Sequence, residues 1–268
     1  MLAVLLSCSK SFQESGPEIY GINFPVMKSN HIPTISNCPP DMVEVEGNFC
    51  LQVEETCLVW DEKVVNANGK VRCLHFAPSK CLSASRKHLH FCMDKFEYQK
   101  DKSDPLPTVM ISYNEMVPLA AKEGKRICFD YEWTFACEGE ELRPYANGWD
   151  RTPDKCNIDK PWIPFDEKKL GSSDSKVRDT EVHRLDQRVP VDANPECLSP
   201  FGIYGIEGNV DEILINTNPD VKHKNTLKSG HWAIGARNRC LPSTNIHNEN
   251  FAFYQLGSRL CKNISNDN

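Results

Sequence analysis

The chain has 268 residues, of which 40% are hydrophobic and 25% are charged, a composition typical of globular proteins. This length suits one large domain or two small ones, and it is enough to bury a substantial core. The formal net charge is −6 and no basic stripe dominates the sequence. Nucleic acid is therefore excluded as an expected partner.

Cysteines are unusually numerous. There are 13, spread along the chain, and no two have the C-x-x-C spacing of a zinc site or a dithiol redox centre. So many scattered thiols indicate an oxidising compartment, where they persist as disulfides. An odd count leaves one thiol over.

The first eight residues, MLAVLLSC, form an apolar run that ends in Cys8 and resembles a bacterial lipobox. We interpret residues 1–8 as a lipoprotein-type signal, short enough to be truncated, with Cys8 as the lipidation site. The alternative is an ordinary signal peptide with a chance cysteine. Lipidation of Cys8 would leave twelve cysteines, an even set for six disulfides. This hypothesis predicts a protein anchored by lipid in the bacterial cell envelope, at the outer membrane or the periplasmic face, or a secreted one.

Residues 9–37 mix Gly, Pro, Ser and Asn and are expected to form a tether. Six cysteines follow between residues 38 and 92. Residues 42–46 alternate apolar and acidic side chains, which predicts a half-buried strand, and residues 91–98 are also strand-like. With a turn expected at 66–70, residues 38–90 form a cysteine-rich β region.

Two helices are expected next. Ser112 and Glu115 have the spacing of a capping box, which predicts a helix that runs to about residue 122 and stops at Gly124. Pro118 falls beyond the first turn, where it costs stability or bends the helix.

The second helix begins after Asp130, a good N-cap, and carries three apolar side chains toward a core: Trp133, Phe135 and Ala136. Residues 138–200 are polar and rich in Pro, Asp and Lys, which indicates long surface loops or a segment organised by metal. Residues 201–215 and 229–261 have the glycines, aromatics and β-branched residues of strands and tight turns.

Several separated segments, in the order in which the family has them, resemble the formylglycine-generating enzyme, or sulfatase-modifying factor, superfamily. The segments are FCMDKFEY (91–98), SYNEMVPLAAKEGKRICFDYEWTFACEGEE (112–141), CNID (156–159), PFGIYGIEGNVDEI (200–213), SGHW (229–232), RNRC (237–240) and LGSR (256–259). The resemblance implies an α+β, C-type-lectin-like domain of low regular secondary structure over residues 91–262. Residues 38–90 would be its cysteine-rich β extension, packed on the main domain, and residues 263–268 a tail.

Catalytic members of this family oxidise a substrate cysteine with copper(I) held by two thiolates, the soft ligands that copper(I) selects. Those cysteines fall between the family's tryptophan element and its R-x-R-C element, an interval that is residues 233–237 here and contains no cysteine. The resemblance therefore argues against copper. It pairs Cys137 with Cys240, and a replacement bridge between Cys128 and Cys261 is the further expectation. The other eight cysteines permit 105 pairings.

Calcium is the cofactor that the resemblance implies as a candidate. The candidate ligands in two sites are Asn157, Ile158, Gly205, Gly208, Val210 and Glu212. One site would begin at Asn157 and Ile158, with Asp186 as a weaker candidate ligand, and the other would use the remaining four residues. In that second site Gly205 replaces an asparagine of the family, which removes one side-chain ligand. The alternative is a loop that Asn209 and Glu212 tie by hydrogen bonds.

The resemblance also places a ligand cleft where the family has its active site. The candidate lining residues are His231, Trp232, Arg237, Arg239, Asn245 and His247. The alternative is that Trp232 packs in the core and both arginines form salt bridges. Elsewhere, His88 and His90 would lie on one face of a strand, a pattern more typical of a surface than of a metal site.

Three functions remain in view. The leading hypothesis is an envelope-anchored domain without copper oxidase chemistry that binds an envelope protein, a peptide or a glycan. The alternative is an oxidoreductase of the formylglycine-generating type that modifies a protein cysteine by an altered mechanism. A third is a purely structural envelope component, and fold alone does not choose among them.

Overall fold

The computed structural model describes residues 36–66 and 69–264. The chain divides into two units, residues 1–35 and 36–268, and the described residues belong to the second. The expected signal segment, the expected lipidation site Cys8 and nearly all of the expected tether lie outside the described residues. Within the part described, no helix is long and apolar enough to cross a membrane.

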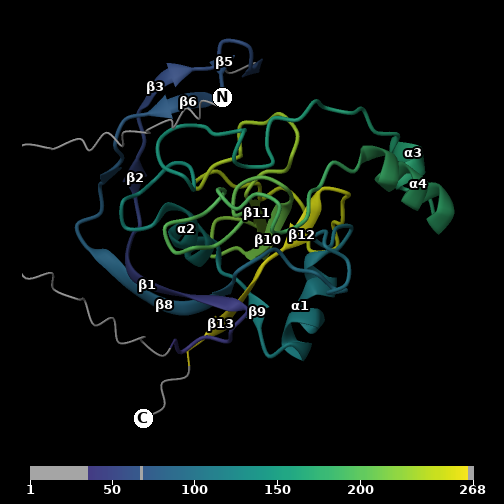
Figure 1. Cartoon of the computed structure of the whole chain (residues 1–268), viewed down its shortest axis with the longest axis horizontal. Coiled ribbons are helices and arrows are strands. Elements are labelled where there is room, and N and C mark those ends of the chain that lie inside the picture. Colours follow the sequence, from purple (N-terminus) through teal and green to yellow (C-terminus); the bar gives the residue numbers. More distant parts are fainter. Residues whose placement is uncertain (1–35, 67–68, 265–268) are drawn as a thin grey trace, which may run out of the picture. The chain divides into compact units, whose positions relative to one another are not determined.

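The fold is α+β, with short helices and mostly small sheets (Figure 1). The predicted fold class is confirmed. The strands are β1 (Met42–Cys50), β2 (Val53–Glu54), β3 (Cys57–Trp60), β4 (Val65–Asn66), β5 (Gly69–Lys70), β6 (Cys73–Phe76), β7 (Lys80–Cys81), β8 (Arg86–Asp94), β9 (Arg126–Ile127), β10 (Asp211–Ile215), β11 (Asn225–Lys228), β12 (Leu256–Ser258) and β13 (Leu260–Asn263), and the helices are α1 (Tyr113–Lys122), α2 (Asp130–Glu138), α3 (Glu167–Leu170) and α4 (Ser175–Leu185).

The first sheet has the order β1-β8-β13-β9, and its long antiparallel ribbon of β1 and β8 is plain in Figure 1. One face of the ribbon buries Val45, Phe49 and Phe91 against the side chains of α2. The strand expected at 42–46 is confirmed and extends to Cys50. The strand expected at 91–98 is the end of β8, which starts earlier, at Arg86, and stops at Asp94.

The second sheet has the order β11-β10-β12, with β10 parallel to β12. Its strands come from the C-terminal half of the chain, and each contributes a residue to the candidate site. Of the strands and tight turns expected across residues 229–261, the strands begin only at Leu256, and residues 229–255 form turns and loops. Ser229 and Gly230 both take positive φ angles there, which ends β11 and redirects the chain.

Helix α1 begins as the capping box predicted. Ser112 is its N-cap and Glu115 accepts from the Ser112 N–H, while Gly124 follows the helix with a φ of 65°. Pro118 lies inside the helix. Asp130 was wrong as the N-cap of α2, since Phe129 holds that position and its N–H donates to the carboxylate of Glu132.

Residues 138–200 are mostly loops, as predicted, but they contain two helices that the sequence analysis missed. Asp166 caps α3 and Asp174 caps α4 through their side chains. In α4 the buried residues are Glu181 and Leu185, so the sequence has no continuous apolar stripe from which the helix could be predicted.

All twelve cysteines of the described part form disulfides. Cys128 is bonded to Cys261 and Cys137 to Cys240, the two pairings that the resemblance implied. The remaining pairs are Cys38–Cys92, Cys50–Cys81, Cys57–Cys73 and Cys156–Cys197. Six disulfides indicate an extracellular or envelope protein.

Candidate functional site

A cleft of about 320 Å³ opens beside the second sheet. Its walls come from β10, β11, β12 and the loops between residues 231 and 255, with one side chain from the polar segment before α3. The lining residues are Phe165, Asp211, Leu227, His231, Arg237, Thr244, His247, Phe251, Phe253, Gln255 and Leu256. A concave, mainly apolar site with a few converging polar groups is the usual form of a ligand-binding pocket.

The charged pair in the cleft is Asp211 with Arg237. The two guanidinium nitrogens of Arg237 donate to the two carboxylate oxygens of Asp211, at 2.8 and 2.6 Å. Asp211 is buried at the start of β10, where its backbone N–H donates to the carbonyl of Gln255. The bidentate pair neutralises both charges and fixes the orientation of the arginine.

His231 is held as a neutral imidazole. Its Nδ1 accepts from the N–H of Ala233 at 3.2 Å and from the amide nitrogen of Gln255 at 3.0 Å. Two donors at Nδ1 leave the ring proton on Nε2, and burial lowers the pKa of His231. In this form the imidazole has one N–H left to donate, on Nε2.

Aromatic rings form the apolar wall. Phe253 stacks on Phe251 with ring centroids 5.6 Å apart and meets the edge of Phe165 at 5.5 Å. His247 lies flat on Phe251, at 3.8 Å between centroids. Burial lowers the pKa of His247 as well. The wall can stack against a flat apolar group of a ligand.

Of the six residues predicted to line the cleft, His231, Arg237 and His247 do so. Trp232 is instead 1% exposed and packs against Tyr254 in the core. Arg239 is not among the lining residues and forms an ion pair with Glu55. Asn245 is not among the lining residues.

The sequence did not predict the residues that surround His231, Arg237 and His247 in the cleft. Asp211 and Gln255 come from β10 and from the segment before β12, and the rings come from residues 165, 251 and 253. The aromatic triplet in FAFY (251–254) was the signal available in the sequence.

A second, buried cavity of about 10 Å³ lies between the loops that precede β10. Three side-chain oxygens at this cavity have no hydrogen-bond partner: Oε1 of Glu97, Oε1 of Glu207 and Oδ1 of Asn157. Burial raises the pKa of Glu97 to about 8 and that of Glu207 to about 7. Such buried and unpaired oxygens are costly unless a cation or a proton compensates them.

The predicted calcium ligands divide around this cavity. Asn157 and Gly205 line it, whereas Ile158, Gly208, Val210 and Glu212 do not. The carboxylate of Glu212 accepts from the Arg259 guanidinium at 2.9 Å and from the Trp133 indole at 2.7 Å. Its hydrogen bonds therefore lie within the core and not at the cavity. An added Cβ at Gly208 would lie 2.3 Å from Ile158, which explains the glycine by close packing.

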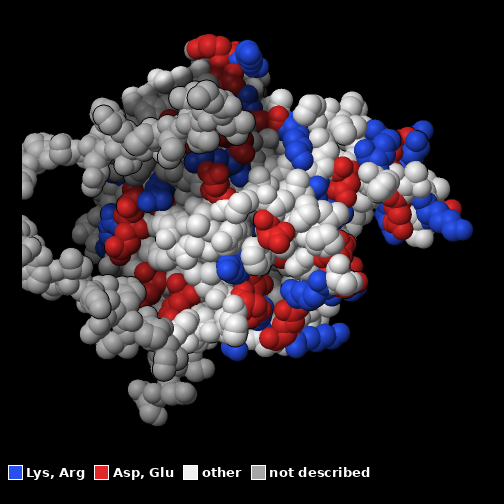
Figure 2. Space-filling model, viewed as in Figure 1, with Lys and Arg blue, Asp and Glu red and all other residues white. Residues whose placement is uncertain are grey.

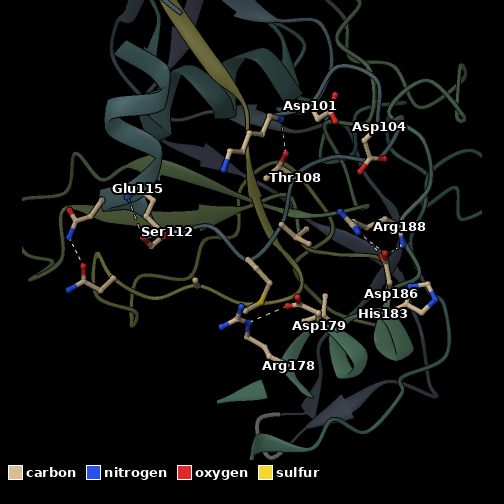
Figure 3. Close-up of a pocket in the computed structure, with 17 residues that line it drawn as sticks. Asp101, Asp104, Thr108, Ser112, Glu115, Arg178, Asp179, His183, Asp186 and Arg188 are labelled. Atoms are coloured by element: carbon tan, nitrogen blue, oxygen red, sulfur yellow. Dashed lines mark hydrogen bonds and ion pairs between the residues drawn. The ribbon is translucent and has the colours of Figure 1, made fainter. Parts of the chain in front are cut away.

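A wider groove of about 1050 Å³ runs between the N-terminus of α1 and helix α4 (Figure 3). Two of its arginines pair with neighbouring acids, Arg188 with Asp186 at 2.7 Å and Arg178 with Asp179 at 3.5 Å, and both signs of charge occur among its other lining residues. Figure 2 shows basic and acidic side chains interspersed on the face that it draws. The groove therefore has no single charge with which to select a ligand.

The fold and the cleft define a disulfide-rich domain of the C-type-lectin-like class with a ligand-sized pocket on its second sheet. More specifically, the chain belongs to the sulfatase-modifying factor enzyme 1-like domain family, whose model matches residues 38–264. That match includes both the cysteine-rich region and the main domain. A search of the curated proteins finds no match.

The chain also aligns with solved structures, of which CarF supports the fold. The crystal structure of CarF aligns with a TM-score of 0.52 and 15% identity, over 85% of this chain and 99% of that one. PvdO from Pseudomonas aeruginosa aligns with a TM-score of 0.44 and 16% identity, over 85% and 95%. Treponema denticola variable protein 1 aligns with a TM-score of 0.42 and 12% identity, over 82% and 99%.

Proposed function

We propose that this protein is a ligand-binding member of its family that acts at the cell envelope or outside the cell. The observation that carries the proposal is the cleft in which the aromatic wall faces the Asp211–Arg237 pair and His231. The charges of the pair cancel, and the imidazole is neutral. The cleft therefore suits an uncharged ligand with a flat apolar face and polar edges, as a peptide side chain or a sugar ring has.

The cysteines support binding over thiolate chemistry. Each of the twelve cysteines in residues 36–66 and 69–264 is bonded to another, so these residues offer no thiolate pair to copper(I). Titration of the oxidised protein with copper(I) should show no stoichiometric thiolate complex. Stoichiometric uptake would instead support an oxidoreductase of the formylglycine-generating type.

The cleft is tested with arrays of peptides and glycans. A ligand retained by the wild type should bind about tenfold more weakly to Phe251→Ala, which removes part of the wall without leaving a charge unpaired. Arg237→Ala should weaken it at least as much. Arg239→Ala is the matched control, since Arg239 pairs with Glu55 outside the cleft. Equal binding by the cleft variants and the control would contradict the proposal.

We further propose that calcium occupies the buried cavity. Glu97, Glu207 and Asn157 supply oxygens, the ligands of a hard cation, and a bound cation would compensate the two buried carboxylates. Excess calcium should raise the thermal midpoint of unfolding relative to chelator, and Glu207→Gln should lose that response. Exposed Glu196→Gln serves as the control. Equal midpoints with calcium and with chelator would exclude the ion.

For the N-terminus we propose a lipid anchor on Cys8, supported by the apolar run that precedes it and by the pairing of the other twelve cysteines. Intact mass spectrometry of the mature protein should find an acylated N-terminal cysteine. An unmodified Cys8, or cleavage at another residue, would contradict the anchor.

A further inference from the structure

The outer face of the β1–β8 ribbon carries four side chains that can bind transition metals. The antiparallel register places Glu46 directly opposite His90. Glu44 and His88 each lie two residues away along their own strands, so all four share one face. The other face of the ribbon is the core face, and these side chains therefore point outward.

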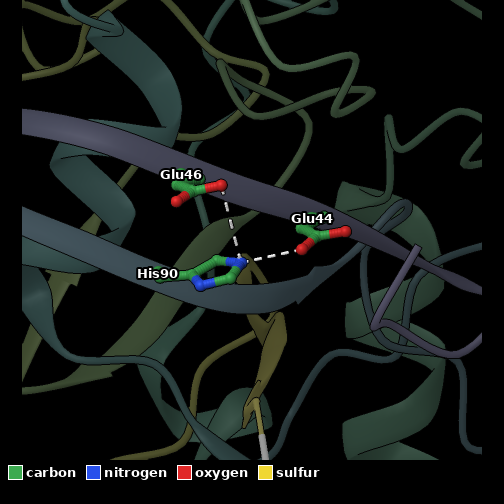
Figure 4. Close-up of side chains that lie close together, drawn as sticks. All are labelled: Glu44, Glu46 and His90. Atoms are coloured by element: carbon green, nitrogen blue, oxygen red, sulfur yellow. Dashed lines mark hydrogen bonds and ion pairs between the residues drawn. The ribbon is translucent and has the colours of Figure 1, made fainter. Parts of the chain in front are cut away.

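Three of them already converge (Figure 4). The Nε2 atom of His90 lies 2.7 Å from Oε1 of Glu44 and 3.8 Å from Oε2 of Glu46. One ligand atom from each of these residues lies within 4.8 Å of the others. Ligands bound at about 2.1 Å around a tetrahedral ion lie roughly 3.4 Å apart, so small side-chain movements complete the arrangement.

We propose that Glu44, Glu46 and His90 bind a zinc ion on this face. An imidazole nitrogen with two carboxylate oxygens is a zinc ligand set, whereas a hard cation such as calcium takes oxygen alone. The two carboxylates balance the charge of the ion. The Nε2 atom of His88 lies 3.5 Å from Oε1 of Glu46 and either orients that carboxylate or supplies a fourth ligand.

The site is built on a rigid base and has an outer shell. Val45 and Phe91, on the opposite face, are fully buried, and the disulfide Cys38–Cys92 fixes the ribbon next to Glu44. The carboxylate of Glu44 also accepts from the side chain and the backbone N–H of Asn37, at 2.9 and 3.1 Å. Such outer-shell donors orient a ligand carboxylate before the ion arrives.

Isothermal titration of chelator-stripped, disulfide-intact protein with zinc chloride tests the proposal. The wild type should bind one equivalent, and His90→Ala should weaken binding by about 10- to 100-fold or abolish it. Glu46→Gln, which changes no volume, should weaken it by about tenfold. Zinc should raise the thermal midpoint of the wild type and leave that of His90→Ala unchanged.

His75→Ala is the matched control, because His75 also forms an outward His–carboxylate pair, with Asp150 at 2.6 Å, but has no second acidic partner in the described structure. It should bind zinc as the wild type does. Near-UV circular dichroism checks that each variant is folded. The proposal is overturned if the wild type takes up no zinc, or if His90→Ala and Glu46→Gln bind it with wild-type affinity.

Discussion

Two parts of the molecule reach stability by different means. The hairpin region, residues 51–85, contains strands β2 to β7, and among its described residues the buried hydrophobic side chains are Cys73 and Phe76. Large apolar side chains such as Leu58 and Trp60 are exposed there. The central domain, β1 together with residues 86–263, instead contains three extended hydrophobic clusters.

Disulfides account for the difference. Cys50–Cys81 and Cys57–Cys73 close the hairpin region over separations of 31 and 16 residues. A short segment of two-stranded hairpins buries too little apolar surface to hold itself together, so covalent links take the place of a core. The hairpin region should therefore respond to loss of a disulfide, and the central domain to loss of a buried contact.

The largest effect is expected from Arg259→Ala in the central domain. Arg259 is fully buried, its guanidinium bonds Glu212, and it also donates to the carbonyls of Asp94 and Tyr204 at 3.1 and 2.9 Å. Its removal leaves the Glu212 carboxylate buried without its cation, at a cost of about 3–5 kcal/mol in the free energy of unfolding. Urea denaturation measures this loss.

The control for that change is Arg143→Ala at the surface. Arg143 pairs with Glu141 at 2.7 Å, but the glutamate is largely exposed, so the expected loss is under about 1 kcal/mol. Equal losses for the two arginines would show that burial of the Arg259 pair is not what stabilises the central domain.

The helices differ in how well the sequence predicts them. The capping box of α1 was predictable because its two hydrogen bonds join residues three apart. Helix α4 was missed because it lies on the surface and buries few side chains, so it lacks the apolar period by which helices are recognised. Asp174, its N-cap, was the one local signal.

The cleft was predictable only where the resemblance reached. His231 and Arg237 lie in the segments that match the family, and the structure places both in the cleft. Their partners lie 26 and 24 residues away in the chain: Asp211, which falls in another matching segment but was not predicted for the cleft, and Gln255. Phe165 lies further still. Contacts at such distances come from tertiary packing, which no local pattern encodes.

Removal of the Cys57–Cys73 disulfide tests the hairpin region. A double Cys57→Ser/Cys73→Ser variant loses the loop closure of about 3 kcal/mol that a link of this length provides. Because little else holds β3 to β6, hydrogen exchange of those strands should rise toward that of an open chain while exchange in β8 and β10 stays slow. Loss of protection throughout the chain would mean that the two parts unfold together.

A pH-dependent effect of intermediate size is expected at Glu138, the buried last residue of α2. Burial raises the pKa of this carboxyl from an ordinary 4.5 to about 8. Between these values the folded protein holds a proton that the unfolded chain has released, so stability falls as the pH rises. Glu138→Gln removes the titration and should flatten the fall between pH 5 and 7 by about 2 kcal/mol. Urea denaturation across that range measures the slope; parallel curves for the two proteins would contradict it.

The smallest effect is expected from Ser112→Ala at the N-cap of α1. The Ser112 hydroxyl accepts from the Glu115 N–H at 3.3 Å, and loss of such a cap costs about 1 kcal/mol. Ser103→Ala, in an exposed turn, should cost less than about 0.5 kcal/mol. The helix keeps its place without the cap because Met116 and Ala120 are fully buried in the second hydrophobic cluster. A loss near 3 kcal/mol would mean that α1, like the hairpin region, depends on one local link rather than on the core.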